Sequence, residues 1–224
     1  AAAQAGIPVW GEVELAWRMR AEVGPAPWLT ITGTNGKTTT VEMLASMLRA
    51  AGLRATAAGN VGTPILEAVL HPEPYDVIAV ELSSFQLHWS STVAPAAGAL
   101  LNLAPDHLDW HGSMAAYAAT KAMIWRGPVA VGNADDRAVS ELLAASASAR
   151  KVGFTLGEPR PGQLGVRDGQ LVDLAFTDVP LELLPAADIR PLGAHNVANA
   201  LAAAALARSR GVAGASVAAG LRAF

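Results

Sequence analysis

Short apolar runs alternate with longer segments of helical periodicity along most of the chain. The runs that predict strands lie at residues 28–32, 77–81, 98–101, 129–131 and 152–155. They are apolar throughout, which is typical of strands that are covered on both faces. The segments that predict helices lie at residues 38–51, 64–70, 115–125, 137–147 and 195–209, with a last helix from residue 216. This alternation predicts an α/β fold, in which a mostly parallel sheet is flanked by helices.

The pattern changes near both ends of the chain. Short strands about the turn signal Asp168-Gly169 predict a small antiparallel β addition within residues 162–173. Near the start, a helical pattern is followed by prolines at positions 25 and 27, which favour extended backbone and are typical of a linker. We therefore expect a domain boundary near residue 27, with residues 28–224 forming the main domain.

Composition excludes several classes of protein. The 224 residues are 52% hydrophobic and 16% charged, with a net charge of -3, so the chain is neither a disordered tail nor a basic nucleic-acid binder. Polar residues such as Asn102, Asp106 and Asn199 interrupt the richest apolar stretches, so no membrane insertion is expected. The chain has no cysteine, which fits a reducing cytoplasm and leaves only oxygen and nitrogen as metal ligands. We expect a soluble monomer.

The strongest chemical signal is the sequence TGTNGKTT at residues 32–39, between a predicted strand and a predicted helix. Glycines let such a loop wrap closely, so that backbone N–H groups and the helix start face a phosphate chain. Lys37 would neutralise the β- and γ-phosphates, and the Thr38 hydroxyl would bind Mg²⁺.

The general phosphate-loop pattern requires glycine at position 31, where this chain has Ile31, so the match is to a shorter variant. The alternative is a plain strand-to-helix turn. The predicted phosphate-binding residues are Gly33, Thr34, Asn35, Gly36, Lys37, Thr38 and Thr39.

Two acidic motifs follow later strands. Glu81 ends the apolar run at residues 77–80, and ligands of an open parallel sheet sit beyond the carboxyl ends of its strands. Glu81 is therefore a candidate Mg²⁺ ligand, with a helix-capping or solvated glutamate as the alternative. His107 lies in DHLD after the strand at residues 98–101, where a histidine can ligate a metal or contact a phosphoryl group. A hydrogen-bonded loop explains that motif equally well.

Three weaker signals do not stand alone. Asn60 lies in GNVG, which is also an ordinary turn motif. Lys121 lies in a predicted helix among alanines, where a surface lysine is the alternative. Asn196 and Asn199 are three residues apart at the start of a helix and could pair with a nucleobase edge, although helix capping accounts for Asn196 as well.

In this order, GTNGKTT, GNVG, ELSSFQL, NLAPDHLD, the later Lys121 and GAHNVANALAAAAL resemble the central ATPase domain of the Mur ligase family. The resemblance covers nearly all of residues 28–224. ELSSFQL, together with DHLDWHGSMAAYAATKAMIW, is most similar to the family member that adds D-glutamate to UDP-MurNAc-L-alanine. It implies a cytoplasmic ligase of peptidoglycan precursor synthesis that forms an acyl phosphate from ATP. A sibling ligase, a folylpolyglutamate synthase-like ligase and a phosphate-loop switch or binding module remain open.

The resemblance also implies roles for individual residues. Thr38 and Glu81 would hold a first Mg²⁺, and His107 would help to hold a second near the acyl carboxylate. Lys121 matches a lysine that CO₂ carbamylates in the family, which would turn it into an anionic metal ligand. Asn60 would contact acyl or phosphoryl oxygens. Asn196 and Asn199 would contact the adenine.

The family has three domains, and the resemblance places residues 1–27 at the end of the uridine-nucleotide-binding domain and its linker. Residues 28–224 would be the central ATP-binding domain, and the third domain would be absent. Since residues 1–4 contain no initiator Met and no signal peptide begins there, we expect a piece of a longer protein. The chain alone is then expected to bind ATP weakly and to have no ligase activity.

Overall fold

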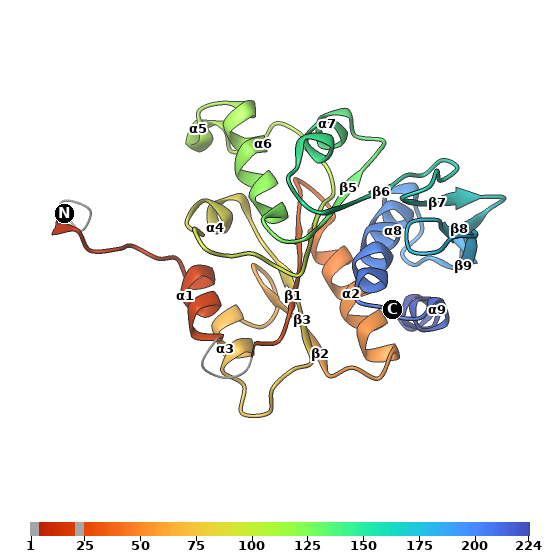
Figure 1. Cartoon of the computed structure of the whole chain (residues 1–224), viewed down its shortest axis with the longest axis horizontal. Coiled ribbons are helices and arrows are strands. Elements are labelled where there is room, and N and C mark those ends of the chain that lie inside the picture. The colour runs from red at the N-terminus through yellow and green to blue at the C-terminus, as the bar shows by residue number, and fades with distance from the viewer. Residues whose placement is uncertain (1–4, 21–24) are drawn as a thin grey trace.

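A computed structural model describes residues 5–20 and 25–224. Its centre is a nine-stranded sheet with the order β2-β3-β1-β4-β5-β6-β7-β8-β9 (Figure 1). Neighbouring strands are parallel from β2 to β7, and β8 and β9 continue the sheet antiparallel. The strands are β1 (Trp28–Thr32), β2 (Ala55–Gly59), β3 (Val77–Glu81), β4 (Ala97–Leu100), β5 (Val129–Asn133), β6 (Arg150–Phe154), β7 (Gln163–Arg167), β8 (Gln170–Asp173) and β9 (Leu181–Pro185).

Helices cover both faces of the parallel part of the sheet. The helices are α1 (Glu12–Met19), α2 (Lys37–Ala50), α3 (Ile65–Val69), α4 (Ser84–His88), α5 (Leu108–His111), α6 (Met114–Ala122), α7 (Arg137–Ala145), α8 (Ala194–Ser209) and α9 (Gly214–Ala223), with 3-10 turns at Met123–Trp125 and Ala186–Asp188. Figure 1 shows α2, α8 and α9 gathered on one side of the sheet, with α1, α3, α4, α6 and α7 on the other. The predicted α/β fold is therefore confirmed.

Successive side chains of each strand point to opposite faces of the sheet, which explains the hydrophobic core on each face. Leu29 and Ile31 of β1 belong to the core that α2 and α8 cover, whereas Trp28 belongs to the core on the opposite face. On β3, Ala79 and Ile78 divide between the two faces in the same way. Successive side chains of a strand point to opposite faces, so both sets must be apolar when both faces are covered.

The predicted strands and the long helices are present, and their bounds lie within three residues of the expected ones. Sequence analysis missed β2 and β9, and the short helices α4 and α5. The β2 segment reads ATAAG, which has little β propensity, and it becomes a strand because it pairs with β3 along its whole length. The last helix begins at Gly214, two residues before the expected start.

The predicted antiparallel addition is present. β7 and β8 pair across a turn at Asp168-Gly169, where both residues have positive φ, of 49° and 73°. Such a turn matches the twist of the strands that flank it. β9 then pairs antiparallel with β8 and completes the sheet.

Helix α1 packs on the same body as the sheet. Val13 and Ala16 are buried in the core on its face, and the Glu14 carboxylate accepts hydrogen bonds from Ser91 and Thr92, which follow α4. The assignment of residues 1–27 to a preceding domain stays a prediction. Residue 24 of the expected linker lies outside the described residues.

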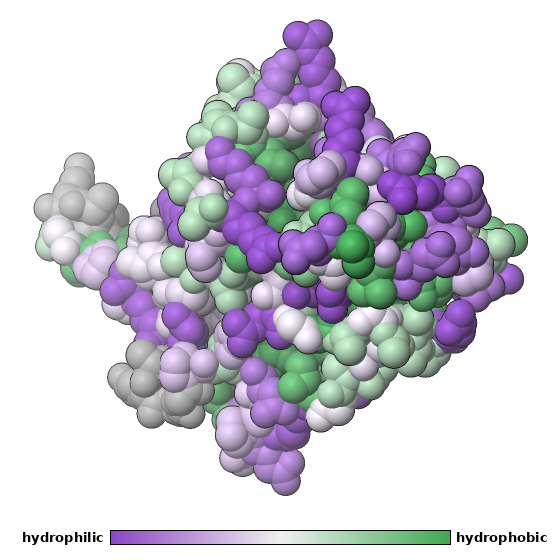
Figure 2. Space-filling model, turned by 45° about the vertical axis from the view of Figure 1, so that its right-hand side comes forward, coloured by the Kyte–Doolittle hydropathy of each residue, from purple (hydrophilic) through white to green (hydrophobic). Residues whose placement is uncertain are grey.

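The surface carries hydrophilic and hydrophobic side chains in small groups, as Figure 2 shows for one face. In residues 5–20 and 25–224, no helix combines the length and apolarity that crossing a membrane requires.

Candidate active site

The predicted phosphate loop connects β1 to α2 at the carboxyl edge of the parallel strands. Gly36 has a φ of 84°, a left-handed conformation that favours glycine, and it directly precedes α2. No side chain caps the start of this 14-residue helix. Its first N–H groups are thus left for an external acceptor, which is the arrangement that binds anions.

Two lysine ammonium groups meet at this loop. Lys37 Nζ donates to the carbonyl oxygens of Gly33 and Thr34, each at 3.1 Å. Lys121 Nζ, from α6, donates to the same Gly33 oxygen at 2.8 Å and to Thr32 Oγ1 at 3.3 Å. Lys121 is 2% exposed, so its interpretation as a surface lysine is wrong.

Burial, together with the nearby charge of Lys37, lowers the pKa of Lys121 from 10.5 to about 7. Asp106 and Glu81 oppose this shift without cancelling it. A large fraction of Lys121 is therefore the neutral amine near neutral pH, a form that an ordinary lysine hardly populates.

Glu81 ends β3 beside the loop. The residue is 1% exposed, so the solvated alternative is wrong. Its Oε2 accepts a hydrogen bond from Thr38 Oγ1 at 2.9 Å, and its Oε1 accepts one from Asn60 Nδ2 at 2.9 Å. Gly59 has a φ of 113°, and a Cβ on it would collide with the Glu81 carbonyl oxygen, so glycine is required there. The structure thus brings Thr38, Asn60 and Glu81 together.

His107 precedes α5 in a left-handed conformation, with a φ of 49°. Its Nε2 lies 3.4 Å from Asp106 Oδ2, and its ring packs on Phe85 with the centroids 4.8 Å apart. A small cavity of about 30 Å³ joins His107 to both lysines. Its lining residues are Gly33, Lys37, Ser83, Ser84, Asp106, His107, Tyr117 and Lys121.

A larger cavity of about 420 Å³ lies on the other side of the loop. Its lining residues are Asn35, Gly36, Leu101, Asn102, Asn133, Phe154, Leu156, His195, Ala198 and Asn199. Asn199 lines the cavity, whereas Asn196 does not and accepts a hydrogen bond from Asn199 Nδ2 at 3.2 Å. Gly193, rather than Asn196, occupies the cap position of α8. The mixture of apolar walls and side-chain amides suits a nucleobase.

Residues 31–207 match the family described as the Mur ligase middle domain. The chain belongs to the Mur ligase family. It is 57% identical over 235 aligned residues to a Streptomyces coelicolor protein named UDP-N-acetylmuramoylalanine–D-glutamate ligase, covering all of this chain and 50% of that protein. A Mycobacterium tuberculosis protein of the same name is 53% identical, with all of this chain and 45% of that protein covered. The chain therefore spans about half the length of the curated relatives it matches.

Solved Mur ligase structures share this fold. A UDP-N-acetylmuramoyl-L-alanyl-D-glutamate–2,6-diaminopimelate ligase superposes with a TM-score of 0.74 at 22% identity, covering 93% of this chain and 48% of that one. Escherichia coli FolC, solved with DHPP and ADP, superposes with a TM-score of 0.66 at 20% identity, covering 95% and 61% of the two chains. At these identities the likeness establishes the fold alone.

The Mur ligase site has oxygen donors that suit magnesium. Mg²⁺ prefers carboxylate, hydroxyl and phosphate oxygens, and Thr38 and Glu81 present a hydroxyl and a buried carboxylate side by side. Within the described ranges, no three His, Cys, Asp or Glu side chains are grouped closely enough to hold a metal by themselves. A bound cation therefore needs phosphate oxygens, water or a modified side chain to complete its shell.

Sequence reasoning missed several residues of this Mur ligase site. Tyr117 is 1% exposed, and its hydroxyl lies 3.1 Å from Thr34 Oγ1. It precedes Lys121 by one helical turn, and this spacing is a signal that could have identified it. Ser84 lines the small cavity and its Oγ lies 3.0 Å from His111 Nε2, a contact that no spacing predicts.

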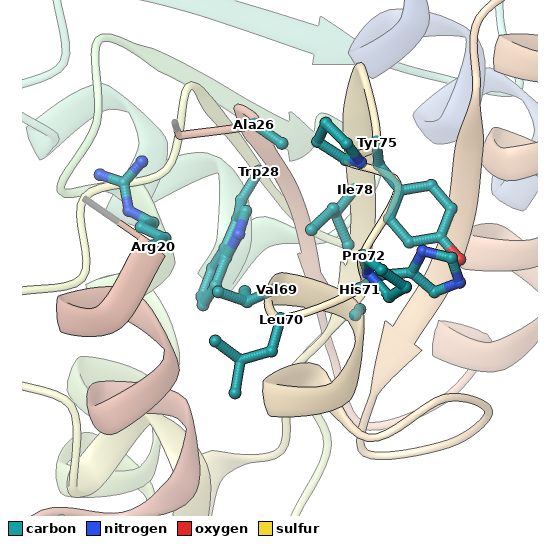
Figure 3. Close-up of a pocket in the computed structure, with 11 residues that line it drawn as sticks. Arg20, Ala26, Trp28, Val69, Leu70, His71, Pro72, Tyr75 and Ile78 are labelled. Atoms are coloured by element: carbon teal, nitrogen blue, oxygen red, sulfur yellow. The ribbon is translucent and has the colours of Figure 1, made fainter. Parts of the chain in front are cut away.

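A separate cavity of about 310 Å³ lies at the opposite, amino edge of the sheet (Figure 3). Trp28 and Ile78, which are paired between β1 and β3, form part of its wall, together with Arg20 and Tyr75. None of the predicted site residues lines it.

Proposed function

We propose that the chain is the ATP-binding part of a cytoplasmic ligase that joins D-glutamate to UDP-MurNAc-L-alanine in peptidoglycan precursor synthesis. The observation that carries the proposal is the convergence of Lys37 and Lys121 on the Gly33 carbonyl oxygen, next to the Thr38–Glu81 hydrogen bond. The names of the relatives at 53–59% identity support this member of the family. A monomer that binds no nucleic acid stays a prediction.

The reaction begins with two anions. The carboxylate of the precursor attacks the γ-phosphorus of ATP, the bond to the bridging oxygen breaks, and an acyl phosphate and ADP result. The amine of D-glutamate then attacks the acyl carbon, loses a proton, and releases phosphate as the amide forms. Charge repulsion limits the first step, so positioning and neutralisation contribute most to catalysis. Lys37 supplies a fixed positive charge, and the uncapped start of α2 supplies oriented N–H groups.

Thr38 and Glu81 would hold a magnesium ion against the phosphates. The ion would neutralise charge that builds up on the transferred phosphoryl group. Asn60 keeps the carboxylate of Glu81 oriented through its Nδ2 hydrogen bond. These residues would therefore act as one unit.

Lys121 would serve as a carbamate. Its neutral amine, populated because the pKa is about 7, attacks CO₂ to form a carbamate and release one proton. The product is an anionic oxygen donor beside His107 in the small cavity, suited to a second cation near the acyl carboxylate. As an ammonium, the same side chain would repel that cation.

The adenine would occupy the larger cavity, where Asn199 offers an amide next to the apolar side chains of Phe154 and Leu156. Contacts with D-glutamate and with the uridine nucleotide would come mainly from the other half of the protein's length. The isolated chain is therefore predicted not to ligate, and normal turnover by it would contradict the three-domain interpretation.

The experiment that tests this function assays the longer protein that carries this chain. UDP-MurNAc-L-alanine, MgATP and one amino acid at a time are supplied, and ADP and the ligated product are both measured. The proposal expects product with D-glutamate alone. If the protein instead joins another amino acid to the precursor that a sibling ligase uses, it is a sibling ligase. Hydrolysis of ATP without any ligated product indicates a nucleotide-dependent switch.

A further inference from the structure

The side chain of Asn102 is paired with the backbone of the phosphate loop. Its Oδ1 accepts a hydrogen bond from the Asn35 amide at 2.8 Å, and its Nδ2 donates to the Asn35 carbonyl oxygen at 3.0 Å. The backbone carbonyl of Asn102 accepts from the Thr34 amide at 3.1 Å. A side-chain amide carries the same donor and acceptor as a peptide group, so Asn102 extends the pairing of loop and strand by one residue.

This pairing selects which loop amides remain free. The amide of Asn35 is occupied, so it does not contribute to binding a phosphate. In the part of the chain that the structure describes, the amides of residues 36–39 donate to no backbone carbonyl. The segment that enters α2 therefore offers free donors, at a position where the helix dipole also favours an anion.

A second asparagine contacts the loop at Gly36. A Cβ placed on Gly36 would lie 2.5 Å from Asn199 Oδ1, so the side chain of Asn199 packs directly on the glycine. Both Asn102 and Asn199 line the cavity of about 420 Å³. The Asn102 side chain uses both Oδ1 and Nδ2 to pair with Asn35, so its orientation is set by the loop.

We propose that Asn102 is a positioning residue that holds the phosphate loop in its anion-binding shape and fixes the loop's distance from the base cavity. The proposal rests on the proposed nucleotide-binding function. It assigns Asn102 to the phosphates, through its effect on the loop, rather than to recognition of the base.

Amide hydrogen exchange tests the pairing directly. The amide of Asn35 donates to the side chain of Asn102, whereas the amide of Thr34 donates to its backbone carbonyl. In Asn102→Ala, the amide of Asn35 loses its acceptor, whereas the amide of Thr34 keeps the backbone carbonyl. We expect protection to fall about tenfold at Asn35 and to stay unchanged at Thr34. Unchanged protection at Asn35, or an equal fall at both amides, would overturn the proposal.

Binding of three probes tests the consequence, measured by calorimetry on the wild-type protein and on Asn102→Ala and Asn102→Ser. Magnesium tripolyphosphate engages only the loop, adenosine only the base cavity, and MgADP both. We expect about tenfold weaker binding of tripolyphosphate and MgADP, with unchanged adenosine binding. Weaker adenosine binding with unchanged tripolyphosphate binding would make Asn102 a base contact and overturn the proposal.

The two tests separate this inference from the proposed function. If the longer protein that carries this chain, without any substitution, binds neither MgADP nor tripolyphosphate, the nucleotide-binding function is contradicted. The exchange contrast between Thr34 and Asn35 still decides whether Asn102 holds the loop.

Discussion

Lys37 and Lys121 donate hydrogen bonds to one carbonyl oxygen, that of Gly33, at 3.1 and 2.8 Å. Two ammonium groups that share an acceptor repel each other, and the buried one loses its proton more readily. This relationship ties the chemistry of α6 to the phosphate loop. It also sets the charge of the site before any nucleotide binds.

Replacement of Lys121 by Met should reveal the pH dependence of this buried group. Because the folded pKa is about 7 and the unfolded value is 10.5, the unfolded state binds more protons between these pH values. The wild-type protein should therefore gain stability relative to Lys121→Met as the pH rises from 7 to 10, by at most about 1.4 kcal/mol per pH unit. Urea unfolding of both proteins at several pH values, in CO₂-free buffer, measures this. A constant difference across the window would show that Lys121 titrates normally.

Carbamylation of Lys121 should be visible by mass. At alkaline pH and with added bicarbonate, native mass spectrometry should detect an adduct of one CO₂ on the wild-type protein. Lys121→Ala should carry no adduct and, in the longer protein, should abolish ligation while nucleotide binding persists. The control is Lys151→Ala, because Lys151 is exposed and lies far along the chain from the loop. An adduct that survives in Lys121→Ala would place the modification elsewhere.

Lys37→Met should weaken the binding of MgATP by roughly tenfold to a hundredfold, since a charge-assisted contact with phosphate is lost. Adenosine binding should not change, because the base cavity does not include Lys37. Calorimetry on Lys37→Met and on the control Lys151→Met distinguishes a local effect from a change in net charge. Equal losses in both variants would remove Lys37 from the phosphate site.

Glu81→Gln should separate metal binding from nucleotide binding. The amide keeps the shape of the side chain but removes the charge that would hold Mg²⁺. We expect about tenfold weaker binding of MgADP and unchanged binding of ADP in EDTA. Glu141→Gln, on the exposed surface of α7, is the matched control. If Glu81→Gln binds MgADP as tightly as the wild-type protein, Glu81 is not a metal ligand.

Glu14 should be a major contributor to the stability of the fold. Burial alone would raise its pKa, but hydrogen bonds from Thr92, Ser91 and Arg18 outweigh this effect and lower the pKa to about 2. The unfolded value is 4.5, so this stability is present above pH 4.5 and is lost as the pH falls through 2. Glu14→Gln should cost about 3 kcal/mol at pH 7, because buried donors lose a charged acceptor.

Urea unfolding at pH 7 and at pH 3 checks this prediction for Glu14→Gln. The exposed Glu67 provides the control Glu67→Gln, which should stay within about 0.5 kcal/mol of the wild-type protein. The difference between the wild-type protein and Glu14→Gln should shrink at pH 3. A difference that is independent of pH would mean that the charge of Glu14 is not what matters.

The sequence by itself determined the features that depend only on residues close together along the chain. The turn between β1 and α2 was predictable, because the glycines of TGTNGKTT act on the backbone of their own segment. Phosphate binding by this turn stays a prediction. Glu81 and His107 were predictable as members of one edge, because parallel strands all end on the same side. The β2 strand could not be predicted from its sequence, because its alanines adopt extended backbone only where β3 offers a partner strand.

The tertiary structure alone decided how these groups act. Residues 33 and 121 are 88 positions apart. The hydrogen bond between them exists because α6 packs against α4 and α5, and Lys121 is buried at the loop. The low pKa of Lys121 follows from that packing, and the pairing of Asn102 with Asn35 follows from the pairing of β1 with β4. Spacing along a chain fixes which groups share an element, whereas distance, burial and local charge depend on how separate elements meet.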